Sequence, residues 1–263
     1  MITGLLLNII ICFAITISSL TFAFVLARNG GEHSEKSKPA LWALVAFWTL
    51  VGATYLPTTI RMLAAYMDKP TIDTIMYNIS AIPFAFISVP LVFFIMYVMI
   101  GNKNISKYVS FIFTIFGAAY LSLFYSSGAI GPQVTELSSI FIVNSDIAIQ
   151  IYLMGLFVFP TAMILGLLLL MFITRSMTIS IHRTVLPLVA ISFVFDFILT
   201  DFITAVDVIQ ITSRVFVLVG TVQAFLAYFP QTVFNDRFSA KNNVETCETD
   251  ENDKTEYEDN IDV

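Results

Sequence analysis

The stretch RVFVLVGTVQAFLAYFPQTVF, residues 214–234, decides the fold class of this chain. A helix needs about 20 apolar residues to cross a bilayer core, and this stretch is the last of seven that are long enough. Uninterrupted apolar runs lack the two-residue alternation of a membrane barrel, so each run predicts a helix. The sequence therefore predicts an all-α integral membrane protein with seven transmembrane helices, near 3–27, 40–66, 74–100, 107–127, 147–173, 184–206 and 214–234.

The composition supports a membrane protein. Hydrophobic residues make up 57% of the 263 residues and charged residues 12%, whereas soluble domains carry about 25% charge. A soluble fold of this size could not bury so much apolar surface. The first apolar run has no basic leader and is longer than the core of a cleaved signal, so we expect it to be a retained helix.

Several chemistries are excluded by missing side chains. The seventh run contains no lysine, which a retinal Schiff base would need in the last helix. The two cysteines, Cys12 and Cys247, offer neither a disulfide framework nor a metal set. The two histidines, His33 and His182, lie in or beside predicted loops, which does not fit haem held between helices. We therefore predict no catalytic activity, no cofactor, no metal and no nucleic-acid partner.

Lysine and arginine are distributed unevenly between the two sides of the predicted bundle. Basic residues near helix ends stay cytoplasmic, so the richer side predicts the inside. Nine lie on one side and three on the other, which predicts an N-terminus outside and a C-terminus in the cytoplasm. The nine are Arg28, Lys36, Lys38, Lys103, Lys107, Arg175, Arg183, Arg237 and Lys241, and the three are Arg61, Lys69 and Arg214.

The negative charge of the chain is concentrated after the last helix. Residues 241–263 contain nine acidic and two basic residues and almost no apolar ones, a composition typical of disorder. We therefore divide the chain into a seven-helix membrane domain, 1–238, and a disordered acidic cytoplasmic tail, 239–263. The tail is either a solvating segment or a docking or phosphorylation segment that a cytosolic partner can reach.

The sixth predicted helix carries two acids at membrane depth. Ser192, Asp196 and Thr200 follow one another at a spacing of four residues, so they form one polar stripe. Asp201 projects about 140° away from Asp196 and lies nearer the outer surface. An ionised aspartate at the helix centre costs about 3 kcal/mol, so each acid must be paired or neutral.

Two arginines are the cations that could compensate these acids. Arg61 is expected at the outer end of the second helix and Arg214 at the outer start of the seventh. Either one could pair with Asp201, whereas Asp196 is too deep for both. The acids are then either interhelical pins or, for Asp196 with Ser192 and Thr200, a ligand, ion or proton site in the outer half of the bundle.

Several apolar stretches resemble one known family. They are LWALVAFWTL at 41–50, IPFAFISVPL at 82–91 and FFIMYVMIG at 93–101, followed by two arginines before a proline-bearing sixth helix and a seventh helix that ends in YFPQTVF. The layout resembles the seven-helix sensor region at the N-terminus of many prokaryotic histidine kinases and diguanylate cyclases. That family places an output domain after the seventh helix, where this chain has a short polar segment.

The resemblance implies a receptor or sensor module of the plasma membrane that signals through its cytoplasmic loops and tail to a separate cytosolic or membrane partner. The other partner that we expect for this module is the lipid bilayer. The alternative is a small transporter or channel subunit that uses the aspartates of the sixth helix. Such a transporter should carry an internal repeat, and the first three and last three helices show no convincing self-similarity.

Overall fold

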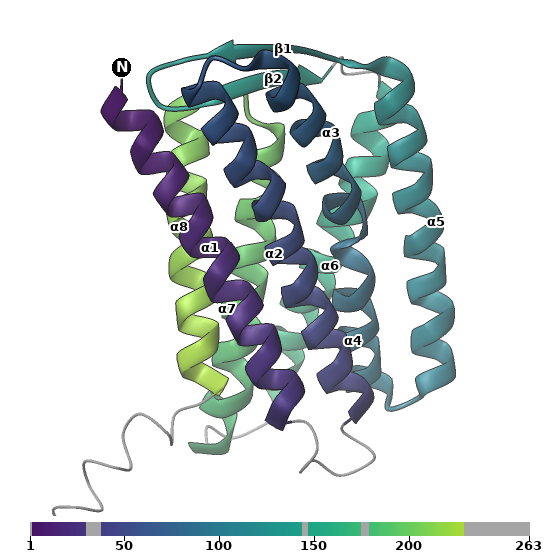
Figure 1. Cartoon of the computed structure of the whole chain (residues 1–263). Coiled ribbons are helices and arrows are strands. Elements are labelled where there is room, and N and C mark those ends of the chain that lie inside the picture. Colours follow the sequence, from purple (N-terminus) through teal and green to yellow (C-terminus); the bar gives the residue numbers. More distant parts are fainter. Residues whose placement is uncertain (1, 30–37, 144–146, 175–178, 229–263) are drawn as a thin grey trace, which may run out of the picture. The chain divides into compact units, whose positions relative to one another are not determined.

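The computed structural model describes the backbone of residues 2–29, 38–143, 147–174 and 179–228, and the side chains of 4–28, 38–143, 147–169 and 187–228 (Figure 1). The chain divides into two compact units, Met1–Ala224 and Phe225–Val263. Of the second unit, only residues 225–228 are described, and they complete the last helix. The predicted acidic tail lies outside the described residues.

The described residues form seven helices, one of which is interrupted. Six of the seven are long and apolar enough to cross a membrane, with Pro70–Ile100 counted as one span. This confirms the prediction of a multi-pass helical membrane protein. The helices are α1 (Ile2–Asn29), α2 (Lys38–Tyr66), α3 (Pro70–Phe86) with its continuation α4 (Ser88–Ile100), α5 (Lys103–Ser127), α6 (Ile147–Thr174), α7 (Ile179–Ile203) and α8 (Asp207–Tyr228).

The third span is broken at Ile87, between α3 and α4. Proline has no N–H, and its ring collides with the carbonyl four residues earlier. Pro90 stands at the third position of α4 and therefore cannot bond to the carbonyl of Phe86, which ends α3. The sequence predicted one continuous helix here, and the break is a consequence of this proline.

The link between α4 and α5 is a tight turn with a cap on each side. Gly101 ends α4 in the left-handed conformation, with φ 71°, which costs glycine little because it has no Cβ. The Asn102 side chain then accepts a hydrogen bond from the backbone N–H of Asn104 at 2.9 Å and caps α5. This turn reverses the chain at the end of the bundle that carries Lys103.

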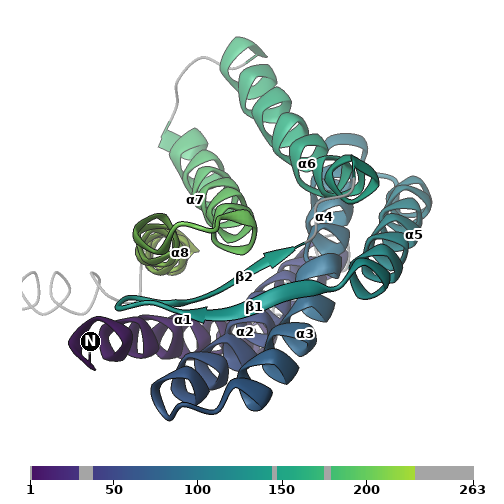
Figure 2. The same ribbon diagram turned by 90° about the horizontal axis from the view of Figure 1, so that it is seen from above.

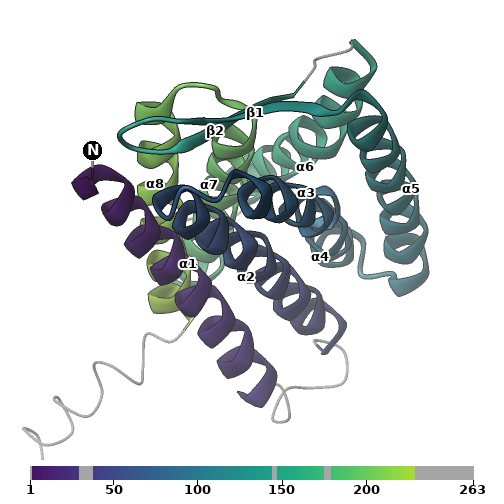
Figure 3. The ribbon, with the colours of Figure 1, turned by 45° about the horizontal axis from the view of Figure 1, so that its top comes forward.

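Residues 129–143, within the predicted connection 128–146, form a β-hairpin that the sequence did not predict. Strands β1 (Ala129–Val134) and β2 (Ser139–Val143) pair antiparallel, with Ile130 opposite Ile142 and an irregularity before Gln133. Figures 2 and 3 show the hairpin lying across the ends of α1, α2 and α3. The hairpin is therefore an ordered cap on the helices.

Small residues let the helices approach one another closely. A Cβ added at Gly52 in α2 would lie 2.7 Å from the side chain of Leu20 in α1, and one at Gly117 in α5 would lie 2.7 Å from the carbonyl oxygen of Ala85 in α3. Close approach at small residues is the usual way in which membrane helices gain contact. Large apolar side chains on every span remain exposed, as a lipid-facing surface requires.

Candidate functional site

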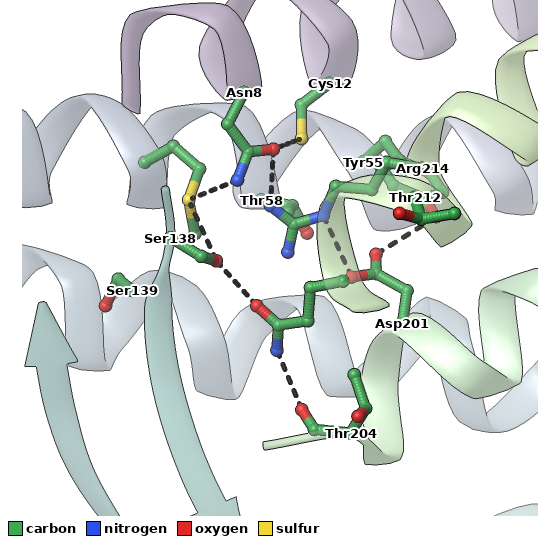
Figure 4. Close-up of polar contacts among 12 residues, drawn as sticks. Asn8, Cys12, Tyr55, Thr58, Ser138, Ser139, Asp201, Thr204, Thr212 and Arg214 are labelled. Atoms are coloured by element: carbon green, nitrogen blue, oxygen red, sulfur yellow. Dashed lines mark hydrogen bonds and ion pairs between the residues drawn. The ribbon is translucent and has the colours of Figure 1, made fainter. Parts of the chain in front are cut away.

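Arg214 is the centre of a buried polar network beneath the hairpin (Figure 4). Its Nε donates to Asp201 Oδ1 at 2.9 Å, and its Nη1 donates to Asn8 Oδ1 at 2.7 Å. The second carboxylate oxygen of Asp201 accepts from the Tyr55 hydroxyl at 3.1 Å. The network thus joins α1, α2, α7 and α8 through one guanidinium, of which 1% is exposed.

Asn8 connects this network to the hairpin turn. Its Nδ2 donates to the backbone carbonyl of Leu137 at 2.7 Å, while its Oδ1 accepts from Arg214. The turn can approach because Gly4, one helical turn earlier, has no side chain. A Cβ at Gly4 would lie 2.6 Å from the carbonyl oxygen of Glu136. The hairpin turn therefore packs directly against α1.

Ser138 and Gln210 form a second connection between the turn and α8. The Ser138 hydroxyl donates to Gln210 Oε1 at 2.5 Å, and Gln210 Nε2 donates to the carbonyl of Thr204 at 2.9 Å. Both the hydroxyl of Ser138 and the amide of Asn8 also face the sulfur of Met62, at 3.9 and 3.8 Å. All these side chains except Thr204 are buried.

Arg61 forms a second buried ion pair, on the α3 side of the hairpin. Its Nε lies 3.0 Å from Asp73 Oδ1, and both side chains are almost fully buried. Ser139 on β2 bonds to both partners, because its hydroxyl donates to Asp73 and its carbonyl accepts from Arg61. The guanidinium also lies about 5 Å from the ring centroids of Tyr77 and Phe141. Two residues of β2, Ser139 and Phe141, therefore contact this ion pair.

Both ion pairs lie in the hairpin end of the bundle. At about 1.5 Å per residue, Arg214 is about 10 Å from the start of α8 at Asp207, and Asp201 is close to the end of α7. The helix that carries Arg214 has 22 residues and is about 33 Å long, close to the thickness of a hydrocarbon core of about 30 Å. Both ion pairs therefore lie in the half of the bundle that is nearer to the hairpin.

An aromatic column leads from the hairpin into the bundle. Successive ring centroids are 3.9 to 5.6 Å apart, and the ring planes differ by no more than 27°. The column begins beside Arg61 and ends on α7 at the residue before Asp196. Its members, in spatial order, are Phe141, Tyr77, Phe202, Phe84, Phe157 and Phe195.

Asp196 lies apart from both ion pairs. Its carboxylate accepts a hydrogen bond from Thr161 on α6 at 2.6 Å, and the hydroxyl of Thr200 bonds to its backbone carbonyl at 3.0 Å. Ser192, one helical turn before Asp196 on α7, is buried. The predicted stripe is therefore present, and through Asp196 it contacts Thr161 on a neighbouring helix.

The structure resolves the choice between the two arginines. Arg214 pairs with Asp201, and Arg61 pairs with Asp73, a residue that sequence reasoning missed. It missed Asp73 because the third helix was predicted to begin at 74, which left this acid in a loop. Arg214 does not stand at the start of the last helix as predicted, since α8 begins at Asp207.

A cavity of about 270 Å³ opens beside the hairpin, between β2 and the ends of α5, α6 and α7. Its walls are mainly apolar, and Gln150 contributes an amide. Among the described side chains, no group of three or more histidine, cysteine, aspartate or glutamate residues could hold a metal ion. The cavity would suit a small apolar ligand with one polar group.

Comparison of the chain with models of protein families, with curated proteins and with solved structures finds no match. The resemblance to kinase sensor regions therefore stays a prediction.

Proposed function

We propose that this chain is a membrane receptor or sensor module without catalytic activity, in which the hairpin is the sensing element. The observation that carries the proposal is the position of the hairpin on both buried ion pairs. Leu137 and Ser138 bind the groups around Arg214, and Ser139 binds Arg61 and Asp73. If the hairpin, residues 129–143, were displaced, the buried ion pairs of Arg214 and Arg61 would therefore lose hydrogen-bond partners.

The helices that would respond are those that the ion pairs join. Losing a hydrogen bond to a buried charge is costly, so the charges must find new partners by moving their helices. The Arg214 network draws on α1, α2, α7 and α8, and the aromatic column continues from β2 along α3 and α7. An event at the hairpin would thus alter helix packing at the opposite end, where the basic loops would contact a signalling partner.

The cavity beside β2 supplies a place for the stimulus. Ile142 and Val143 form part of its wall, so a ligand bound there would press on the strand that carries Ser139. Its volume of about 270 Å³ fits a small molecule with mainly apolar surface. The proposed stimulus is therefore a small apolar or lipidic ligand.

The test is to displace the hairpin and to measure the distance between α1 and α4 at the opposite end of the bundle. Gly4→Leu would place a side chain where the carbonyl of Glu136 now lies, so it should lift the turn. Spin labels on cysteines that replace Phe24 and Met99, both exposed and distant from the hairpin, would report distances between α1 and α4 in nanodiscs. Cys247 would be changed to serine, and Cys12, which is buried, would be changed to alanine.

We expect Gly4→Leu to shift or broaden the distance distribution between the two labels. Gly166→Leu is the matched control, because a Cβ at Gly166 meets nothing within 4 Å. A further label at Glu136 would verify that the turn has moved. If the turn moves and the distances at the far end stay those of the parent, the hairpin does not control the bundle and the proposal fails.

The alternative of a transporter rests on Asp196. Its hydrogen-bond partners, Thr161 and Thr200, lie beside apolar neighbours on α7 such as Phe195 and Ile198, and the described contacts do not continue it into a polar path. Proton or ion flux into proteoliposomes would favour the transporter, provided that the flux is lost in Asp196→Asn. We expect no such flux.

A further inference from the structure

A second cavity lies at the opposite end from the hairpin, between α2, α4 and α5. Its volume is about 660 Å³, and it is open to the surface of the bundle. Its walls are mostly apolar and include the small side chains of Ala43 and Ala46 on α2 and the ring of Pro90 on α4. It is a lateral groove wide enough for an apolar chain.

Two lysines stand at the mouth of this groove. Lys38 is the first residue of α2 and Lys103 the first residue of α5, so both are at helix ends on the same side. Neither forms an ion pair with a residue that the structure describes. Helix N-termini carry partial positive charge, and α2 and α5 both begin here. The mouth therefore attracts an anion strongly, while the interior attracts an acyl chain.

Ser110 supplies a second, independent observation. Its side chain lines the groove two helical turns deeper than Lys103, and it is buried. Its hydroxyl oxygen is covered by protein and has no hydrogen-bond partner among the described residues, which is costly for a buried donor and favours a turn of the hydroxyl toward the groove when an acceptor enters. Thr114, one turn further, already donates to the carbonyl of Ser110 and leaves that hydroxyl free. An ester carbonyl entering the groove below an anionic headgroup would accept its hydrogen bond.

We propose that this groove binds one anionic phospholipid, independently of the proposed sensing role. The phosphate and the rest of the anionic headgroup lie between Lys38 and Lys103, an ester carbonyl accepts from Ser110, and an acyl chain lies against Leu50, Phe86 and Phe93. Basic pockets between membrane helices on the cytoplasmic side are known to bind acidic headgroups. A zwitterionic lipid fits less well, because its own cation would face the two lysines.

Trp42 makes this proposal measurable. It lines the groove and is 59% exposed, whereas the other tryptophan of the chain, Trp48, is fully buried against Phe22 and Phe47. A brominated lipid quenches tryptophan fluorescence only at contact range, so quenching would report mainly on Trp42. The full chain would be placed in phosphatidylcholine nanodiscs that contain either brominated phosphatidylglycerol or, at the same mole fraction, brominated phosphatidylcholine.

We expect brominated phosphatidylglycerol to quench at least twofold more than brominated phosphatidylcholine. The double variant Lys38→Gln with Lys103→Gln should quench equally with both lipids. Lys107→Gln, one turn along α5 and outside the groove, is the matched control and should keep the preference. Ala46→Phe, which fills the groove from an exposed position and retains both lysines, should lose the preference as well.

Three results would each overturn the proposal. Equal quenching of the parent by both lipids would mean that no anionic lipid is selected. A preference that survives in the double lysine variant would mean that these lysines do not hold the headgroup. A preference that survives in Ala46→Phe would mean that the anionic lipid is attracted to the basic surface and does not occupy the groove.

Discussion

A guanidinium can be buried in a membrane protein only with a counter-charge and hydrogen-bond acceptors, and Arg214 has both. Asp201 and Asn8 accept from it, and Tyr55 satisfies the remaining oxygen of Asp201. The need for such a partner could be predicted from the sequence, because Asp201 lies inside an apolar run. The identity of the partner could not, since it depends on which helix faces α7, and apolar runs do not determine helix order.

The variant Asp201→Asn should lower the free energy of unfolding by about 3–5 kcal/mol, because the guanidinium of Arg214 stays buried and loses its counter-charge. Denaturation of the protein in bicelles would measure this. Asp68→Asn is the control, since Asp68 is exposed and asparagine accepts its positive φ of 55°. A loss in Asp201→Asn no larger than that in the control would contradict the assigned role.

Asp196→Asn tests a different kind of contact. The amide oxygen of asparagine can still accept from Thr161, so the free energy of unfolding should change by about 1 kcal/mol or less. The measurement is the same denaturation in bicelles. A loss as large as that of Asp201→Asn would mean that a charged carboxylate at this position stabilises the fold, which the contacts of Asp196 do not indicate.

Helices and strands differ in how far the sequence reveals them. Apolar length located the seven helices, six of which are candidate membrane spans. It placed the start of the last helix at 214, because the first turns of α8 carry polar side chains such as Gln210 and Ser213 that are buried in the network. The hairpin was missed for a related reason. Its stability comes from contacts with Asn8, Gln210 and Arg61, which are distant in sequence.

The contact between α3 and α5 depends on Gly117. Gly117→Leu would bring a side chain onto the carbonyl of Ala85, which belongs to the backbone and cannot turn aside, so we expect a loss of about 1–3 kcal/mol. Thermal unfolding in nanodiscs would show it as a lower midpoint. Gly155→Leu is a milder comparison on α6, since its nearest neighbour, the ring of Phe116, is 3.5 Å away and can move. Equal midpoints would contradict the close packing of these helices.

On the scale of the whole molecule, the two ends of the bundle differ in exposed charge. Arg61 and Arg214 counted toward the hairpin side in the sequence, but both are buried in ion pairs, which leaves Lys69 as the exposed base at that end among the described residues. The opposite end exposes Arg28, Lys103 and Lys107. Three exposed bases against one is the same ratio as nine against three in the sequence, and the prediction from that ratio is a hairpin outside the cell.

A reporter enzyme that works only in the cytoplasm would test this orientation. We expect activity when it is fused after Lys103, at the start of α5, and none when it is fused within residues 130–140 of the hairpin. The basic residues near α4 and α5 are the physical reason, because they resist translocation. Activity of the hairpin fusions would reverse the assignment and place the hairpin in the cytoplasm.

The pairing of Asp201 with Arg214 has a consequence for the way in which the chain is made. The two residues are separated by thirteen positions, so the ribosome delivers the acid to the membrane shortly before the base. Either α7 or α8 alone would bring an uncompensated charge into lipid, whereas the pair enters neutralised. The translocon would therefore release α7 and α8 together as a helical hairpin. Asn8 on α1 and Tyr55 on α2 are synthesised earlier, so both side chains would already be in the bilayer when the pair arrives.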